Sequence, residues 1–132
     1  MKEADFNTLL GHWTSAHKAE LGTSIFEGKL CRLDKKKSIG AYDFEDHQLP
    51  LLRAAEGEGF WYKFPDLGMQ TPCDGMFFKG DGYVALYWWK PRKVKRCTLI
   101  RIGDLDKFFT TVTKKSIRQE EAEKIATYSF DM

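Results

Sequence analysis

Glu27 and Lys29 are the residues whose types and spacing most clearly suggest chemistry, since they stand two positions apart in an apolar segment. In a β-strand, residues two apart point to the same face, so a carboxylate and an ammonium group would lie side by side. A carboxylate can bind a divalent cation, and a lysine can orient water or neutralise charge on a phosphate. Gly28 leaves its backbone carbonyl accessible as a further oxygen ligand. The pair suits metal-assisted phosphodiester hydrolysis, whereas an exposed strand can also alternate Glu and Lys for solubility alone.

Apolar periodicity and turn residues predict the elements that must position this pair. Leu49, Leu52 and Ala55 share a helical face, and Pro50 is tolerated only in a first turn, which places Gln48 near the helix start. Gly-Asp-Gly at 80–82 predicts a β-hairpin, and Ser116 followed by Gln119 predicts a capping box. We expect helices over 5–18, 44–55 and 117–126, and strands over 23–33, 60–64, 74–79, 83–89 and 96–102.

This order predicts an α/β (α+β) fold, with residues 1–132 forming a single domain around a central mixed β-sheet flanked by helices. The chain has 132 residues, of which 42% are hydrophobic and 30% charged, enough to bury one core. The longest apolar stretch, 83–89, is far shorter than the roughly 18 residues of a membrane helix. Three widely spaced cysteines suggest neither a disulfide framework nor a zinc site. We therefore expect a cytoplasmic protein without membrane contact.

Positive charge is concentrated in two segments. Residues 29–37 hold five Lys or Arg against one Asp, and residues 79–101 hold seven against one, so the remainder carries −8 in a chain of net charge +2. Such patches favour phosphate contact, although a basic loop can also be merely solvated. The candidate nucleic-acid-binding residues are Lys35, Lys36, Lys37, Lys90, Arg92, Lys93, Lys95 and Arg96. The neighbouring aromatic run 87–89 can stack on bases or belong to the core.

Three motifs in order resemble the PD-(D/E)XK nuclease superfamily, especially RecU-like Holliday-junction resolvases of bacteria and their small phage relatives. They are Phe-Glu-Gly-Lys at 26–29, Asp-His-Gln-Leu-Pro-Leu-Leu at 46–52 and Gly-Phe-Trp-Tyr-Lys at 59–63. The resemblance implies a restriction-endonuclease-like fold and a homodimeric endonuclease that uses Mg²⁺ or Mn²⁺ and acts on DNA, preferably branched. It also implies the cytoplasm of a bacterial or phage-infected host cell.

The resemblance also assigns roles to individual residues. Glu27 would be a metal ligand, Lys29 the catalytic lysine, and Gln48 the helix residue that supports the site or contacts phosphate. Glu20 would stand for the acidic residue that many members supply from their first helix. The chain departs from the family in one respect, because no aspartate precedes the Glu-x-Lys segment at the usual distance.

A Pro-x-Asp sequence instead lies downstream, at 72–74, and we expect Asp74 to complete the site from a later strand. Asp66, next to Pro65, is the reserve candidate. The metal ligands expected are thus Glu27, Asp74 and Gly28, with Glu20 and Asp66 as further candidates. Aspartates beside Pro and Gly also close turns, which is the alternative for Asp66 and Asp74.

A second alignment gives a different function. If Asp74 keeps the family's usual order, the Glu-x-Lys position falls on Trp88-Trp89-Lys90, where tryptophan replaces the carboxylate. The chain would then be a catalytically inactive nucleic-acid-binding module of the same fold. A small-molecule-binding protein that uses its aromatic hairpin is a third possibility. No P-loop, dinucleotide-binding or zinc-binding pattern occurs, so we expect no nucleotide cofactor.

Overall fold

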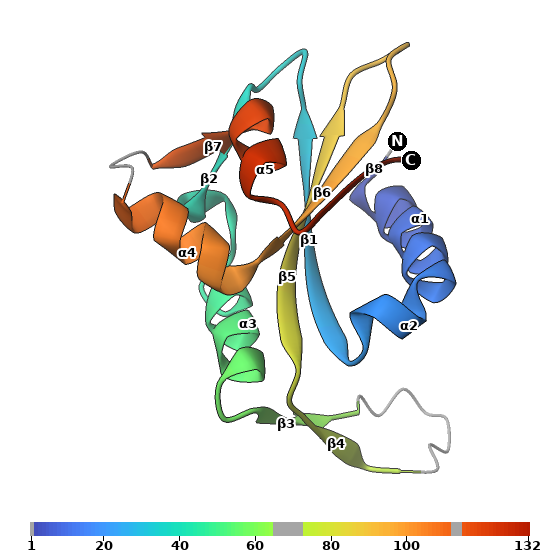
Figure 1. Cartoon of the computed structure of the whole chain (residues 1–132), viewed down its shortest axis with the longest axis vertical. Helices are drawn as coiled ribbons and strands as arrows, with labels where there is room; N and C mark the ends of the chain where they lie inside the picture. The colour runs from blue at the N-terminus through green and yellow to red at the C-terminus, as the bar shows by residue number, and fades with distance from the viewer. Residues whose placement is uncertain (1, 65–72, 112–114) are drawn as a thin grey trace.

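The central sheet joins four strands that are far apart in the sequence (Figure 1). The computed structural model describes residues 2–64, 73–111 and 115–132. Strand β1 (Ser24–Arg32) pairs in parallel with β5 (Asp81–Trp89), which pairs antiparallel with β6 (Arg96–Arg101), and β6 pairs antiparallel with β8 (Tyr128–Asp131). The sheet is therefore mixed, as expected, with β1 at one edge and β5 inside.

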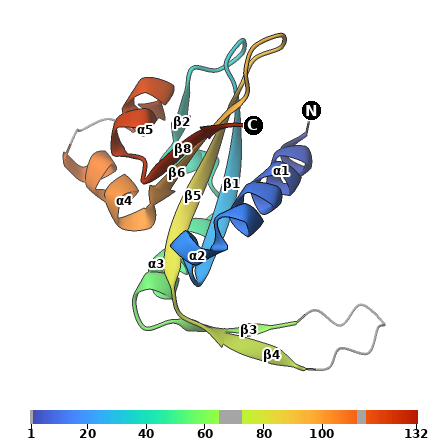
Figure 2. The ribbon, with the colours of Figure 1, turned by 45° about the vertical axis from the view of Figure 1, so that its right-hand side comes forward.

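Helices cover both faces of this sheet, which confirms the expected single α+β domain (Figures 1 and 2). On one side lie α1 (Glu3–Ala16) and the short α2 (Lys18–Leu21), and on the other lie α3 (Gln48–Glu56), α4 (Ile102–Thr111) and α5 (Gln119–Ile125). A 3₁₀ turn, η1 (Ala41–Asp43), precedes α3, and β2 (Ser38–Gly40) pairs with β7 (Ser116–Arg118). None of the helices in the described ranges has the length and apolar character that crossing a membrane requires.

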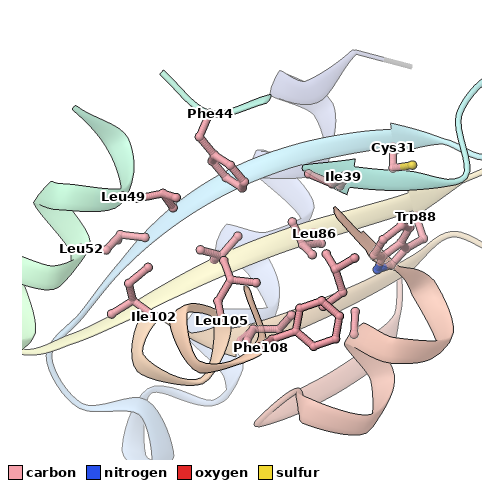
Figure 3. Packing of buried hydrophobic residues seen from close by; sticks show 14 residues of the cluster. Cys31, Ile39, Phe44, Leu49, Leu52, Leu86, Trp88, Ile102, Leu105 and Phe108 are labelled. Atoms are coloured by element: carbon pink, nitrogen blue, oxygen red, sulfur yellow. The ribbon is translucent and has the colours of Figure 1, made fainter. Parts of the chain in front are cut away.

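Strand β5 divides its side chains between two hydrophobic clusters because successive residues point to opposite faces. Leu86 and Trp88 pack with α3, α4 and β1 residues in the cluster of Figure 3, and Tyr83 and Tyr87 pack toward α1. Every residue from 82 to 88 is buried. This is the pattern of a strand covered on both faces, so β5 forms the axis of the fold.

The expected hairpin between 74–79 and 83–89 is wrong. Strand β4 (Gly75–Phe78) pairs instead with β3 (Phe60–Lys63), and this β3–β4 ribbon projects from the body (Figure 2). The intervening glycines serve close packing rather than a two-residue turn. A Cβ on Gly82 would lie 2.8 Å from the Leu52 carbonyl oxygen, and one on Gly80 would lie 2.4 Å from that of Thr23.

Helix α3 confirms one expectation and the C-terminal region corrects another. Helix α3 begins at Gln48, and Pro50 lies in its first turn, where its missing N–H costs no hydrogen bond.

Residues 116–118 form β7 rather than a capped helix start, because Ile117 pairs with Ile39 of β2. Helix α5 starts later, where the Glu121 carboxylate accepts from the Arg118 N–H at 3.1 Å. Helix α4 and strands β2 and β8 were not expected.

Candidate functional site

Glu27 and Lys29 lie on the face of β1 that looks toward α3, since their neighbours Ile25 and Cys31 belong to the cluster on that side. Gln48, the first residue of α3, donates a hydrogen bond from Nε2 to Glu27 Oε1 at 2.7 Å. Residues that are 21 positions apart in the sequence are thereby joined. Three expected site residues, Glu27, Lys29 and Gln48, are on one side of one strand.

The local structure before α3 fixes the orientation of the Gln48 amide. Its Oε1 accepts a hydrogen bond from the Glu45 N–H at 2.8 Å, so its Nε2 is the group that remains to donate to Glu27. His47, the residue that caps α3, is largely exposed and lies 3.6 Å from Glu45 Oε2. Gln48 therefore holds the Glu27 carboxylate in one position through this hydrogen bond.

The surroundings of Glu27 disfavour the ionised form of its carboxylate. Burial raises its pKa, and the nearby Glu3 carboxylate raises it further, while Lys29 and His47 act in the opposite direction. Glu3, in the first turn of α1, is fixed by accepting a hydrogen bond on Oε2 from the Leu30 N–H at 3.2 Å. Two carboxylates thus lie beside the edge of β1, an arrangement that a bound cation would relieve.

The free edge of β1 adds a backbone oxygen to this arrangement. In an extended strand, N–H and C=O groups of alternate residues point to the same side. The Leu30 N–H points to the free edge, where Glu3 binds it, so the Gly28 carbonyl points there too. An open groove of about 380 Å³ runs between this edge and α1, with Glu27 and Gly28 in its β1 wall. The expected accessibility of Gly28 is consistent with this geometry.

Lys29 is half-buried, and its Nζ lies 5.6 Å from the ring centroid of Phe44. A cation over an aromatic face is attracted by the ring quadrupole, which restrains an otherwise flexible side chain. The neighbouring Asp43 is already bound by Lys36 at 2.5 Å and by the Gly40 N–H at 2.7 Å. Although burial opposes it, these hydrogen bonds lower the pKa of Asp43. Asp43 is thus hydrogen-bonded to other groups, and Lys29 lies on the same face of β1 as Glu27.

The donor set can be tested against the expected metal. Mg²⁺ and Mn²⁺ prefer hard oxygen ligands, and Mg²⁺ is commonly held by one or two protein carboxylates together with water and substrate phosphate. Glu27, Glu3 and the Gly28 carbonyl supply such oxygens. Within residues 2–64, 73–111 and 115–132, no group of three or more His, Cys, Asp or Glu side chains is gathered as a metal-binding cluster. The described residues thus offer two carboxylates and one backbone carbonyl near the edge of β1, without a preformed metal-binding cluster.

The other expected acidic ligands are placed elsewhere or cannot be placed. Asp74 is exposed at the outer end of the β3–β4 ribbon, where its carbonyl accepts from the Phe64 N–H at 2.9 Å. The ribbon projects away from the body of the protein in both views (Figures 1 and 2). The structure does not bring Asp74 and Glu27 together. Glu20 is exposed on α2. Asp66 lies outside the described residues.

Glu3 was not anticipated, although a signal for it exists. Glu3 and Asn7 are four positions apart at the start of the first helix, so they lie on the same helical face. That face meets the edge of β1, because Glu3 binds Leu30 and Asn7 also lines the groove. An acidic residue followed by an amide at this spacing could have indicated a functional face. Glu3, and not Glu20, is the carboxylate of the first two helices that acts on the pKa of Glu27.

The basic loops that follow β1 and β5 lie at one end of the sheet. Because β1 and β5 are parallel, both strands finish at the same end of the sheet (Figure 2). There the Leu33 N–H donates to the Trp89 carbonyl at 2.7 Å. The loops that follow these strands are therefore neighbours, although more than 50 positions separate them. We call them the basic end; its exposed residues are Lys35, Lys36, Lys37, Lys90, Arg92 and Lys93, with Lys95 half-exposed.

Arg96 differs from the rest of the expected basic set. Its guanidinium lies 2.6 Å from Glu123 and 2.8 Å from Asp131, so its charge is matched by two carboxylates. Hydrogen bonds to these two groups raise the pKa of Arg96. Arg96 therefore ties β6 to α5 and β8. Lys36 is also paired, with Asp43.

The aromatic run 87–89 belongs largely to the core. Tyr87 and Trp88 are fully buried, and Trp88 donates from Nε1 to Thr98 Oγ1 at 3.0 Å. Trp89 is half-buried, packs near Phe6, and has the Arg32 guanidinium 5.0 Å from its ring centroid. Of the two alternatives for this run, Tyr87 and Trp88 belong to the core and have no exposed ring surface on which a base could stack.

Comparison with protein-family models, with curated proteins and with solved structures gave no match in any of the three.

Proposed function

We propose that this chain is a metal-dependent DNA endonuclease that hydrolyses phosphodiester bonds, with a preference for branched DNA of the Holliday-junction type. The observation that carries the proposal is the hydrogen bond between Gln48 and Glu27, which joins the Glu-x-Lys strand to the start of the following helix. Lys29 lies on the same face as Glu27, and the basic end continues from the same strand. The proposed fold type is restriction-endonuclease-like.

Each residue has a role that follows from its position. Lys29 would orient the attacking water or neutralise charge developing on the phosphate. Gln48 would hold the Glu27 carboxylate so that its second oxygen faces outward. Glu27, Glu3 and the Gly28 carbonyl would hold Mg²⁺ or Mn²⁺. The metal would supply Lewis acidity toward the phosphate and lower the pKa of a bound water.

The basic end would bind the phosphates that flank the cleaved bond. Strand β1 rises about 3.3 Å per residue, so the end of β1 is about 17 Å from Glu27. This distance corresponds to about five nucleotides of one strand, at about 3.4 Å of duplex axis per nucleotide. Lys35, Lys37, Lys90, Arg92 and Lys93 carry most of this attraction, because Lys36 and Arg96 are paired with carboxylates.

Asp74 would contribute from the second copy of a homodimer. It lies at the outer end of the β3–β4 ribbon, which projects from the body (Figure 2), and the ribbon exposes 63% of Trp61 and 61% of Phe77. A two-stranded ribbon is marginal in water unless it packs against something. A second copy that covers these side chains would bring the ribbon, and with it Asp74, to another chain.

Mixing two inactive variants tests this arrangement. Glu27→Gln and Asp74→Asn homodimers should each fail to cut, whereas mixed dimers should regain one intact site and nick DNA. Recovery up to about a quarter of wild-type nicking is expected, because half of the randomly formed dimers are mixed and each has one site of two. No recovery on mixing would mean that Asp74 acts within its own chain, and an active Asp74→Asn protein would remove it from the site.

The decisive experiment for the function is cleavage of labelled four-way junction and matched linear duplex in Mg²⁺ or Mn²⁺. Wild-type protein should cut the junction in preference, and Lys29→Ala and Glu27→Gln should lose at least about 100-fold in rate while still binding. Lys124→Ala, which removes the same charge from the exposed outer surface of α5, is the matched control and should cut normally. Unchanged cutting by Lys29→Ala would overturn the assignment.

A catalytically inactive nucleic-acid-binding module is the second candidate, and two observations favour it. The basic end unites two segments that are distant in sequence. The described ranges also hold no cluster of three acidic or other metal-binding side chains. This candidate predicts salt-sensitive DNA binding without cutting in any divalent metal, and neutralising Lys35, Lys37, Lys90 and Lys93 together would abolish that binding.

A further inference from the structure

Asn7 is a polar side chain of the α1–β1 groove whose orientation is fixed by the fold. Asn7 Oδ1 accepts a hydrogen bond from the Tyr87 hydroxyl at 2.6 Å. Tyr87 is fully buried, and its ring is stacked on Phe6 with 5.3 Å between centroids. Burial raises the pKa of Tyr87, so its hydroxyl remains a donor at any pH at which the protein would work. The amide oxygen is thereby committed to Tyr87.

Gly28 makes this contact possible. A Cβ at position 28 would lie 2.5 Å from Asn7 Oδ1 and 2.9 Å from the Tyr87 hydroxyl oxygen, so any side chain there would collide with the pair. The middle residue of the Glu-Gly-Lys segment is thus a glycine on the face opposite to Glu27 and Lys29. The segment that carries the proposed catalytic residues also seats the Asn7–Tyr87 hydrogen bond.

The remaining half of the amide has no described partner. With Oδ1 bound, Asn7 offers its two Nδ2 hydrogens. Among the residues that the structure describes, none accepts a hydrogen bond from Nδ2, and Asn7 lines the same open groove as Glu27. The groove wall continues along α1 with Gly11, which leaves open space, and Thr14. Asn7 is exposed, so a neutral donor held in one orientation faces the open groove and suits an incoming oxygen acceptor.

We propose that the α1–β1 groove binds the substrate strand and that Asn7 Nδ2 donates to a non-bridging phosphate oxygen next to the cleaved bond, with Tyr87 as the residue that positions the amide. This inference rests on the proposed nuclease function and adds a substrate-binding residue to it. Asn7 discriminates by chemistry: an amide donates to a phosphate oxygen, whereas a carboxylate in its place repels it.

The test uses the whole protein and labelled four-way junction, with binding measured in Ca²⁺ and cleavage in Mg²⁺. Asn7→Ala should raise KM and the dissociation constant about ten- to hundredfold, the loss of one hydrogen bond to a charged group, with little change in kcat. Asn7→Asp keeps an oxygen for Tyr87 and should fold normally, yet it should bind DNA at least as poorly. Tyr87→Phe should weaken binding about fivefold, since it only frees the amide. His12→Ala, on an exposed position of α1, is the control and should be unchanged.

The outcomes separate this inference from the function on which it rests. Wild-type KM and affinity in both Asn7 variants, together with an inactive Lys29→Ala protein, would overturn the role of Asn7 and leave the nuclease standing. Weakened binding in the Asn7 variants of a protein that never cuts would support the groove and refute the nuclease. Absence of both binding and cutting in the wild type would refute both. Thermal midpoints of the variants within a few degrees of wild type would show that the losses are not losses of folding.

Discussion

Strands β5 and β3 contain similar residues and have opposite environments. Tyr-Trp-Trp at 87–89 ends β5, and Phe-Trp-Tyr at 60–62 begins β3. Trp88 is fully buried, whereas Trp61 is 63% exposed. The difference comes from the neighbours: β5 lies between β1 and β6 with helices on both faces, while β3 pairs only with β4. Aromatic content alone therefore does not indicate a binding surface, and the position of the strand in its sheet decides.

The same comparison bears on function. We call the central sheet and its helices the body. There, a hydrogen bond from Gln48 of α3 fixes Glu27 of β1, and one from Tyr87 of β5 fixes Asn7 of α1. On the ribbon, the exposed side chains of Trp61, Tyr62, Met76 and Phe77 project into solvent. Catalytic groups need fixed positions, and docking surfaces need exposed apolar area. The body is suited to the first role and the ribbon to the second.

Truncating one tryptophan in each region gives the largest expected contrast. Trp88→Ala removes a fully buried ring and the hydrogen bond to Thr98, so it should lower the free energy of unfolding by about 3–5 kcal/mol. Trp61→Ala should change the free energy of unfolding of the monomer by less than about 0.5 kcal/mol. Urea denaturation followed by circular dichroism measures both. Equal losses would contradict the assignment of β3 to an exposed ribbon in the monomer.

A pair of glycines sharpens the contrast within the groove itself. Gly28→Ala must displace Asn7 or Tyr87 and should lower the free energy of unfolding by about 1–3 kcal/mol. Gly11→Ala meets nothing within 4 Å and lies in helix α1, so it should stabilise the protein by about 0.5–1 kcal/mol. Thermal denaturation of the two variants, made in parallel, measures the difference. A stabilising Gly28→Ala would disprove the close approach.

Removing one hydroxyl from each region should give a smaller effect. Tyr87→Phe deletes the donor to Asn7 in a buried environment and should cost about 1 kcal/mol in the free energy of unfolding. Tyr62→Phe, on the half-exposed ribbon, should be close to neutral. Chemical denaturation at pH 7 can resolve these values. Neutral behaviour of Tyr87→Phe would mean that water replaces the hydroxyl without loss.

The smallest effect concerns pH. Because burial and Glu3 raise the pKa of Glu27 in the folded protein, ionisation of Glu27 disfavours folding, and this cost appears as the pH rises above its ordinary value of 4.5. Glu27→Gln cannot ionise, so it should be slightly more stable than wild type at pH 7, by less than about 1 kcal/mol. The advantage should disappear below pH 4.5. A variant that is less stable than wild type at pH 7 would contradict this reasoning.

The sequence predicted elements whose signals are local. The strand at 24–32 follows from its apolar content, and the start of α3 at Gln48 follows from the fixed geometry of Pro50. The link between Glu27 and Gln48 was expected only through the family resemblance. Long-range pairing was not predictable: β7 forms because Ile117 meets Ile39, which overrides the capping signal of Ser116.

Two glycines have a role that their sequence does not reveal. The Gly-Asp-Gly sequence at 80–82 predicts a turn, but the Gly80 N–H donates to the Ala55 carbonyl and Gly82 packs against Leu52. A glycine that permits close packing and a glycine that permits a turn are identical in sequence. Glu3 was missed for a related reason, since nothing in the sequence shows that α1 lies along the edge of β1.

The Gly80 N–H donates to the Ala55 carbonyl at 2.9 Å, so the chain leaves the body and returns to it at nearly the same point. The ribbon is therefore an excursion within the crossover from β1 to β5, whose register is set by the sheet itself. Because loop closure depends only weakly on length, a short glycine-containing link could replace it without unfolding the sheet. The body would then be a minimal scaffold, and the ribbon an exchangeable insert.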